Sequence, residues 1–490
     1  MTRRAGLAAR RAPAPGLILA VASAGPLLAL FAFTVPLTTL TSTAASLQAG
    51  PGAQAWILSA MSVGAAAGLM SSGAIGDDYG RRRTFLAGLL FLAGSSVLGA
   101  LAPTALVLII ARILQGLGGA AILACSLGAI GHAFPDGPER GRATGVWAAA
   151  LGAGVAIGPI LSAGLDMLGG WRLPYVVTAL AAAALAVAVG TVLPESRADK
   201  PRPIDLPGTL LLGLGLAALL TGLTEARMGW GPLVLVLLLV GLALLAGFVA
   251  VERRMADPML DLALFRRPAF VGATVAALAA GAGVLSLMSL IPTLVERAMG
   301  VSALLAAILL LAWSATTVVT ALGARWLPPG MSPRVQLVAG LLGCAAGQLA
   351  LFGLTPASSI ARLLPGLAIA GAANGVLNAA LGRQAVDSVP ADRAAMGSGA
   401  NNTARHLGSA IGLTVVTVLM THAGAAAGAA GLVSGWNIAV LVTAGFSLVG
   451  ALVVFLARGR RAGQTGIMTR EPGPGVRRRF HQATGRKDAR

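Results

Sequence analysis

Long apolar runs, separated by short polar and charged stretches, recur along the whole chain. Each run is close to the ~20 residues that a helix needs to cross a bilayer. The runs are rich in Gly, Ala and Leu and lack the alternating apolar and polar positions of a membrane β-strand. The pattern predicts fourteen transmembrane helices, at 16–40, 53–75, 84–102, 104–131, 143–165, 172–193, 207–224, 232–250, 269–292, 303–323, 335–354, 360–382, 400–422 and 436–457.

Composition supports this interpretation. Of the 490 residues, 56% are hydrophobic and 11% are charged, and the mean hydropathy is +0.83. A soluble protein carries about 25% charged residues, so most of this surface must face lipid. Since only helices and closed barrels satisfy their backbone inside a bilayer, we expect an all-α polytopic membrane protein.

Basic residues are divided unequally between the two sides of these helices. With the N-terminus in the cytoplasm, the inner loops hold sixteen Lys and Arg residues and the outer loops hold three. Cytoplasmic loops carry such an excess of positive charge. Arg also far outnumbers Lys in a chain rich in Ala and Gly, which points to a high-G+C bacterial genome. We therefore expect a multi-pass protein of the bacterial cytoplasmic membrane with both termini in the cytoplasm.

The net charge of +19 does not indicate a nucleic-acid partner. Fourteen of the 36 Lys and Arg residues lie in the two tails, where we expect them near anionic lipid headgroups. The four histidines have no metal-like spacing, and no nucleophile elbow or phosphate-binding loop appears. We expect no metal site, no cofactor and no enzymatic activity.

A weak internal repeat indicates two equivalent halves. The segment 111–117 (ARILQGL) recurs at 361–367 (ARLLPGL). Downstream of each copy a proline precedes a glycine by seven residues, Pro138 before Gly145 and Pro390 before Gly397. Parallel six-helix repeats build rocking transporters, whose substrate cavity lies between the halves. The predicted organisation is a basic cytoplasmic N-tail, a six-helix bundle, a cytoplasmic linker, two inserted helices, a second linker, a second six-helix bundle and a disordered basic C-tail, at 1–15, 16–193, 194–206, 207–250, 251–268, 269–457 and 458–490.

One loop, 73–83, carries two acids and three arginines between two apolar runs. A loop this short forces the flanking helices into an antiparallel hairpin. Gly73 and Gly80 permit close helix approach and a tight turn. Asp77 can accept hydrogen bonds from Arg81, whose guanidinium donates as a fork.

Two further stretches place unusual residues inside predicted helices. Arg112 lies about 12 Å inside the outer end of its helix at 1.5 Å per residue, where a charge costs about 3 kcal/mol. It either faces the bundle interior or snorkels to the interface. Gly154 and Gly158 allow close helix contact, and Pro159 removes one backbone hydrogen bond.

These stretches resemble the signature motifs of the major facilitator superfamily. The 73–83 loop resembles its Gly-x-Leu-Ala-Asp-Arg-x-Gly-Arg-Lys loop, which latches the two halves on the cytoplasmic side. Residues 112–120 resemble Arg-x-x-Gln-Gly-x-Gly-x-Ala, and residues 154–163 partly resemble the antiporter signature. The resemblance implies a cytoplasmic gate at Gly73, Asp77, Gly80 and Arg81, proton coupling by Arg112, and an antiporter-motif helix at Gly154, Gly158 and Pro159.

Within the superfamily, the chain is most similar to the fourteen-span drug:proton antiporters. Trp56 and the segments 170–172, 261–266 and 402–412 carry that similarity. The implied fold is two six-helix bundles plus two inserted helices. Residues of polar or aromatic character inside the spans are candidates for the substrate cavity: Trp56, Gln115, Asn378, Asn402 and Arg405.

The chain departs from this branch in two ways. Asp78 stands where an arginine is usual, so the charge network of the gate must be rewired. The span at 16–40 lacks the usual aspartate, and residues 1–76 contain no carboxylate at all. This absence weakens the case for cationic drugs. It also leaves few groups that can carry a proton, among which Glu225 is the candidate at the end of an apolar run; a solvated helix cap beside Arg227 is the alternative.

We therefore expect a secondary transporter that exports small hydrophobic or amphipathic compounds, such as drugs or secondary metabolites, by alternating access and in exchange for protons. Three alternatives stay open: an importer of the same fold, an uncoupled facilitator, and a non-transporting receptor or assembly protein.

Overall fold

The computed structural model describes residues 14–134, 137–198, 203, 205–255, 258–328, 331–424 and 428–457. The predicted disordered C-tail, and residues 1–13 of the N-tail, lie outside this range. The described part of the chain is helical throughout, without strands.

Helices α1 to α9 account for the first half of the chain: α1 (Pro15–Thr34), α2 (Pro36–Leu47), α3 (Pro51–Tyr79), α4 (Arg81–Ala100), α5 (Ala105–Ala133), α6 (Pro138–Gly169), α7 (Leu173–Val192), α8 (Leu206–Ala226) and α9 (Pro232–Glu252). The second half contains η1 (Leu262–Arg266), α10 (Pro268–Ala280), η2 (Gly281–Leu285), α11 (Ser286–Ser289), α12 (Ile291–Met299), α13 (Ala303–Gly323), η3 (Ala324–Trp326), α14 (Pro333–Leu349), η4 (Ile360–Arg362), α15 (Leu363–Asp387), η5 (Ala391–Arg393), α16 (Ala394–Gly424) and α17 (Gly428–Leu456).

Proline marks where many of these helices begin. Helices α1, α3, α6 and α9, among others, have Pro within their first two residues. An N–H group at that position would have no intrahelical acceptor, so proline loses nothing there by lacking one. The fixed φ of proline also suits the first turn of a helix. Thirteen segments of the described chain are long and apolar enough to span a membrane. The predicted span at 335–354 is not among them, because α14 has 17 residues.

The structure corrects three details of the predicted helices. Helix α3 continues through Asp77 and Asp78 to Tyr79, so the expected loop shrinks to Gly80 alone. The first span is broken at Val35, because Pro36 cannot donate to the carbonyl of the preceding turn. Arg362, which falls in the predicted span at 360–382, lies in the 3₁₀ turn η4 at the start of the apolar segment Ile360–Asp387, where it is exposed and donates to the carbonyl oxygen of Phe352 (2.9 Å).

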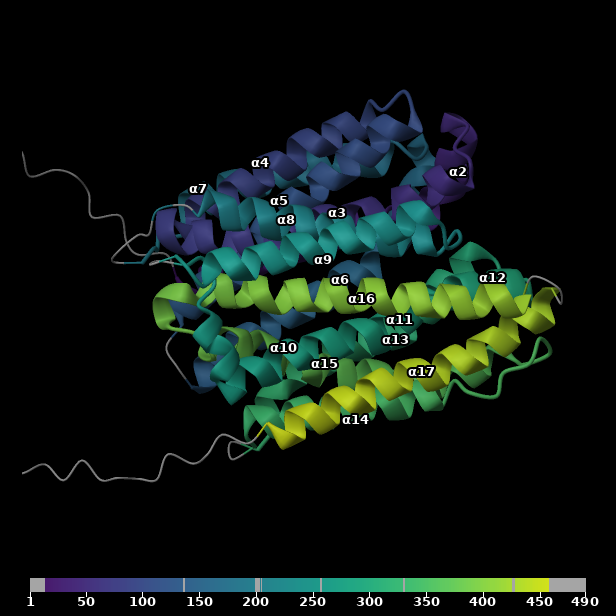
Figure 1. Ribbon diagram of the computed structural model, residues 1–490. Helices are drawn as coiled ribbons and strands as arrows, with labels where there is room; N and C mark the ends of the chain where they lie inside the picture. The colour runs from purple at the N-terminus through teal and green to yellow at the C-terminus, as the bar shows by residue number, and fades with distance from the viewer. Residues whose placement is uncertain are drawn as a thin grey trace, which may run out of the picture. The chain divides into compact units, whose positions relative to one another are not determined.

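Buried apolar side chains form several clusters. Two of these each lie within one half of the sequence, and a third joins the two halves. One buried cluster runs from Val21 to Leu193, and another from Ala276 to Val454. A third combines Leu69 and Leu123 with Ala321 and Val386, and so joins the two parts. Figure 1 shows α4 and α7 along one edge, α14 and α17 along the other, and α8, α9 and α16 between them.

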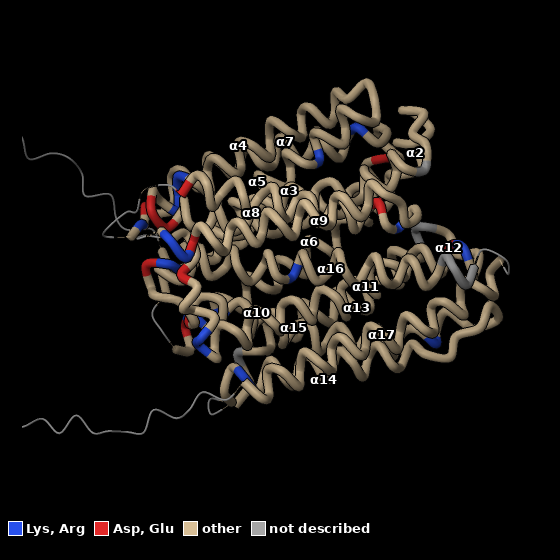
Figure 2. The backbone as a smooth tube through the Cα atoms, viewed as in Figure 1, with Lys and Arg blue, Asp and Glu red and all other residues tan. Residues whose placement is uncertain are grey.

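Charged residues gather at one end of the helices, as Figure 2 shows. This charged end, as we call it, includes the C-terminus of α3, the start of α4 and η5, with Asp77, Arg81 and Arg393. The opposite end holds Asp166 near the C-terminus of α6 and Glu225 near that of α8.

Glycines set how closely α3 and α5 approach. A Cβ atom on Gly116 would meet the carbonyl oxygen of Met61 and lie 2.6 Å from the amide nitrogen of Ala65. Backbone atoms cannot swing aside as a side chain can. Gly94 on α4, in contrast, has nothing within 4 Å of an added Cβ atom.

We expect Gly116→Ala to destabilise the folded protein by about 1–3 kcal/mol, because α3 and α5 must separate to admit the methyl group. Gly94→Ala serves as the control and should be neutral or stabilising by about 0.5–1 kcal/mol, as alanine favours a helix. Thermal unfolding of the detergent-purified protein measures both. Equal melting temperatures for the two variants would contradict the packing described here.

The positive-inside pattern generates a second prediction. Arg197, after α7, and Ala357, before η4, are both exposed, whereas the native Cys125 and Cys344 are buried. A membrane-impermeant maleimide should label Arg197→Cys only from the cytoplasmic side and Ala357→Cys only from the outer side. Labelling of both from the same side would overturn the predicted topology.

Candidate functional site

The predicted gate begins with a buried ion pair at the charged end. Asp77, near the end of α3, lies 2.7 Å through Oδ1 from Nη2 of Arg81, the first residue of α4. Arg81 Nε also donates to the same oxygen (2.8 Å). Both side chains are almost fully buried, at 0% and 1% exposed. Burial makes the pair sensitive to the loss of either partner.

The same carboxylate binds the start of α16. The backbone N–H of Ala395 donates to Asp77 Oδ1 (3.0 Å), and that of Met396 donates to Oδ2 (2.7 Å). The first N–H groups of a helix have no intrahelical acceptor, and the helix dipole favours a negative charge there. Asp77 therefore caps a helix that begins more than 300 residues later in the sequence.

Two arginines add further bonds between the α3–α4 hairpin and η5, one from each side. Arg81 Nη2 donates to the carbonyl oxygen of Asp392 in η5 (3.1 Å). Arg393 Nη1 lies 2.7 Å from Asp78 Oδ1, and both of these residues are buried. The aspartate that departs from the family pattern is thus paired with an arginine from the other half of the sequence. We call the assembly of Asp77, Asp78, Arg81, Arg393 and the two amides of α16 the latch.

Both predicted gate glycines lie at close contacts of the latch. Gly80 has φ +126°, and an added Cβ atom would lie 2.7 Å from the Glu195 carboxylate. That carboxylate accepts the backbone N–H of Arg82 (3.0 Å) and lies 3.6 Å from Arg83 Nε. A Cβ atom on Gly73 would lie 2.5 Å from the Ala395 carbonyl oxygen. Gly73, Asp77, Gly80 and Arg81 are therefore brought together around the start of α16.

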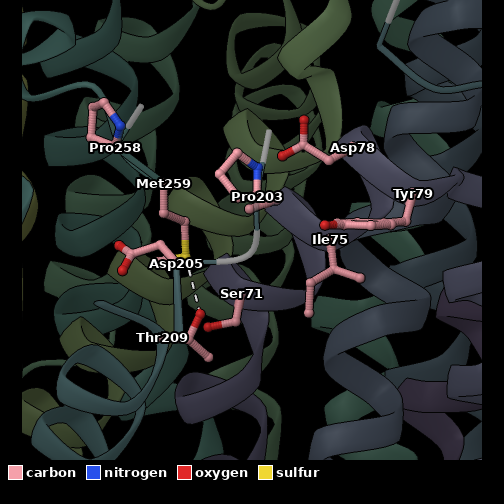
Figure 3. A pocket seen from close by; sticks show the side chains of 10 residues that line it. Ser71, Ile75, Asp78, Tyr79, Pro203, Asp205, Thr209, Pro258 and Met259 are labelled. Carbon is pink, nitrogen blue, oxygen red and sulfur yellow. Dashed lines mark hydrogen bonds between the residues drawn. The ribbon is translucent and has the colours of Figure 1, made fainter. Parts of the chain in front are cut away.

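A small pocket lies beside the latch. Figure 3 shows Ile75, Tyr79 and Ser71 of α3 on one side and Asp205, Thr209 and Met259 on the other, with Asp78 at its edge. Asp205 caps α8 by accepting the N–H of Gly208 (2.8 Å), and its side chain contacts that of Glu252 at the end of α9. Both acids are buried. Sequence reasoning did not single out this pair.

Arg112 is completely buried and bound to backbone carbonyls. Its Nη1 donates to Ala32 O (2.6 Å), its Nη2 to Phe33 O (3.0 Å) and its Nε to Ile57 O (3.3 Å). The Ala32 carbonyl lacks a helical donor because Pro36 stands four residues later. Arg112 therefore points into the bundle and joins α5 to α3 and to the break between α1 and α2.

Gln115 continues this network. It accepts from Arg112 Nη1 (3.1 Å) and donates to Ser96 Oγ on α4 (2.9 Å). The antiporter-motif glycines pack α6 against α1: a Cβ atom on Gly154 would lie 2.6 Å from Leu27 O, and one on Gly158 would meet Thr34 Oγ1. Pro159 lies inside the continuous helix α6.

Glu225 and Trp56 meet near the opposite end. Trp56 Nε1, on α3, donates to Glu225 Oε1 at the end of α8 (2.7 Å). Two residues later, Arg227 donates to Ser59 Oγ on α3 (3.2 Å) and to Thr414 Oγ1 on α16 (3.3 Å). The end of α8 thus contacts α3 and α16, the same two helices that the latch joins at the charged end.

The remaining predicted cavity residues lie on α15 and α16. Arg405 Nη2 donates to Asn402 Oδ1 (2.6 Å), and Nη1 lies 3.5 Å from Asn378 Oδ1. Arg405 and Asn378 are partly exposed. The next residue, His406, contacts the ring of Phe33 on α1, with ring centroids 6.4 Å apart.

The comparisons with known proteins agree with this geometry. The model of the Major Facilitator Superfamily matches residues 22–413. Multidrug resistance protein Stp of Mycobacterium tuberculosis is 33% identical over 74% of this chain and 67% of its own length. Puromycin resistance protein pur8 of Streptomyces alboniger is 30% identical over 93% of this chain and 94% of its own.

Solved structures show the same fold. The proton:xylose symporter XylE, bound to 6-bromo-6-deoxy-D-glucose, superposes with a TM-score of 0.66 at 16% identity, over 90% of this chain and 95% of its own. The family match over most of the sequence, the full-length relative and the shared fold together show that this chain is a polytopic membrane protein of the Major Facilitator Superfamily.

Proposed function

We propose that this protein is a secondary active transporter that exports small hydrophobic or amphipathic compounds from a bacterial cell in exchange for protons. Its relatives are named for multidrug resistance and for resistance to puromycin. The family and fold belong to transporters rather than enzymes. In this proposal the charged end faces the cytoplasm, in line with the positive-inside pattern.

The latch is the observation that carries the proposal. It joins the α3–α4 hairpin to η5 and α16 through buried bonds to ionised groups, and such bonds contribute about 1.5–3 kcal/mol each. Alternating access requires the two halves to separate at one end while they close at the other. A latch of a few charge-assisted bonds holds the closed state yet can be broken when substrate binding favours the other state.

Proton coupling is the second part of the proposal. Arg112 stabilises the break between α1 and α2, so any movement of α1 relative to α5 must disturb its bonds to the carbonyl oxygens of Ala32 and Phe33. Glu225 lies against α3 and beside Arg227, which contacts α16, so its surroundings change when these helices separate. We assign the proton-binding role to Glu225 and the coupling role to Arg112.

Transport into everted membrane vesicles, with and without an uncoupler, separates this function from its alternatives. An exporter concentrates substrate in the lumen only while a proton gradient exists. A facilitator equilibrates the substrate regardless of the uncoupler, an importer depletes the lumen, and a receptor moves nothing.

The first prediction concerns the latch. Asp77→Asn should reduce transport about tenfold or more, because the loss of charge-assisted bonds shifts the balance between the two states by at least 1.4 kcal/mol. Its control is Asp166→Asn at the opposite end, where the carboxylate accepts only from Ser42 Oγ (2.7 Å) among the described residues. Parental transport by a well-expressed Asp77→Asn variant would exclude the latch as a gate.

The second prediction concerns coupling. Arg112→Ala should abolish uncoupler-sensitive transport, because the carbonyls of Ala32 and Phe33 lose their donor. Arg362 occupies the equivalent position of the internal repeat but is exposed, so Arg362→Ala should transport normally. Monodisperse purification of the Arg112→Ala protein excludes simple misfolding. Glu225→Gln should uncouple transport while leaving substrate binding intact. Parental, uncoupler-sensitive rates in the Arg112→Ala variant would contradict the assignment.

A further inference from the structure

The middle of the described bundle contains positive charge and no acid. Every Asp and Glu that the structure describes lies in a connection or within four residues of a helix end. Two arginines lie deeper: Arg112 is the eighth residue of α5, and Arg405 is the twelfth of α16. At 1.5 Å per residue, Arg405 lies about 16 Å from the start of its helix.

The two arginines differ in how their charge is neutralised. Arg112 is 0% exposed and donates to three backbone carbonyls and one side-chain amide. Arg405 is partly exposed, and among the described residues it makes two bonds, both to amide oxygens. A guanidinium has five N–H donors, so Arg405 keeps unused donors and has no carboxylate partner in that part of the chain.

The position of Arg405 is fixed by close backbone packing. Its backbone carbonyl oxygen packs so closely against Gly281, at the start of the π-helical turn η2, that a Cβ atom on that glycine would clash with it. This contact holds one side of α16 against α10 and η2. The guanidinium extends toward Asn378 on α15, and His406 meets Phe33 of α1. The residue that follows Arg405 on α16 therefore forms a ring contact with α1, from the other half of the sequence.

A cation held inside a bundle without a counter-ion is unfavourable, so such a position selects for an anionic partner. The planar fork of arginine matches a carboxylate or sulfonate with two parallel hydrogen bonds. The neighbouring rings of Phe33 and His406 suit an aromatic or otherwise apolar body.

We infer that Arg405, with Asn378 and Asn402, binds the negatively charged group of the exported compound, so that the substrates are amphipathic organic anions. This inference rests on the proposed function and specifies its substrate class. The described residues in the middle of the helices include no acid that could pair with a cationic compound, and this also favours anionic substrates.

Three naphthalene probes that differ only in charge test the inference: naphthalene-2-sulfonate, naphthalene-2-sulfonamide and N,N,N-trimethyl-2-naphthylammonium. Uptake of each is measured in everted vesicles that contain the full-length protein, under a proton gradient and with an uncoupler. The parent should transport the sulfonate in preference to the other two. Arg405→Gln should reduce sulfonate uptake about tenfold or more, as expected when a charge-assisted pair is lost, and should leave sulfonamide uptake unchanged.

Two further variants sharpen the result. Arg405→Lys keeps the charge but not the fork and should retain part of the sulfonate uptake. Arg405→Glu should transfer the preference to the ammonium probe. Arg362→Gln, which removes an exposed positive charge, is the matched control and should behave as the parent.

Each other outcome overturns the inference. Transport of the ammonium or sulfonamide probe but not the sulfonate by the parent would refute an anion site while leaving export intact. Equal loss of all three probes in a well-folded Arg405→Gln variant would make Arg405 a general transport residue rather than a charge-selective one. Transport of no probe by the parent would overturn the inference together with the proposed function.

Discussion

The carboxylate of Asp77 accepts hydrogen bonds from the unpaired amides at the start of α16, and the arrangement of the charged end depends on that interaction. It joins residues 318 positions apart in the sequence. A carboxylate buried this completely is stable only when surrounded by donors, and here Arg81 and two backbone amides supply them. Gly73 is required because no side chain fits against the backbone of Ala395, and Gly80 because its φ is +126° and the Glu195 carboxylate lies beside it. Asp78 and Arg393 add a second buried pair, so the departure from the family pattern strengthens the same connection.

At the charged end acids and arginines are paired, whereas the middle of the described helices holds arginines without acids. Arg112 binds the Ala32 carbonyl, which Pro36 leaves without a helical donor, and also the Ile57 carbonyl, and thereby joins α5 to α3 and to the break after α1. Arg405 has only amide partners among the described residues and remains partly exposed. One arginine is thus satisfied by the protein itself, whereas the other is available for a ligand. The described acids lie in connections or near the helix ends, where Glu225 accepts a hydrogen bond from Trp56 of α3, one of the helices that the latch joins.

The sequence predicts the helices and one side of the latch well, because apolar runs and the spacing of Gly, Asp and Arg are local signals. It does not reveal the groups that bind Asp77 and Asp78 from the other half of the chain. The backbone amides of Ala395 and Met396 have no sequence motif, and Arg393 lies more than 300 residues from Asp78. Likewise, the repeat at 111–117 and 361–367 suggests equivalent arginines, yet Arg112 is buried and Arg362 is exposed, because α15 begins only after that residue. The Asp205–Glu252 contact also joins distant helix ends that no local pattern connects.

The central claim is that the latch opens and closes during transport, and a distance measurement tests it most directly. Arg83 on α4 and Asp392 in η5 flank the latch and have exposed side chains, 71% and 50%. Spin labels at Arg83→Cys and Asp392→Cys should give one short distance by pulsed electron paramagnetic resonance in the latched state. Adding Asp77→Asn should create a second, longer population. A single short distance, unchanged by that substitution and by transported substrate, would contradict the account.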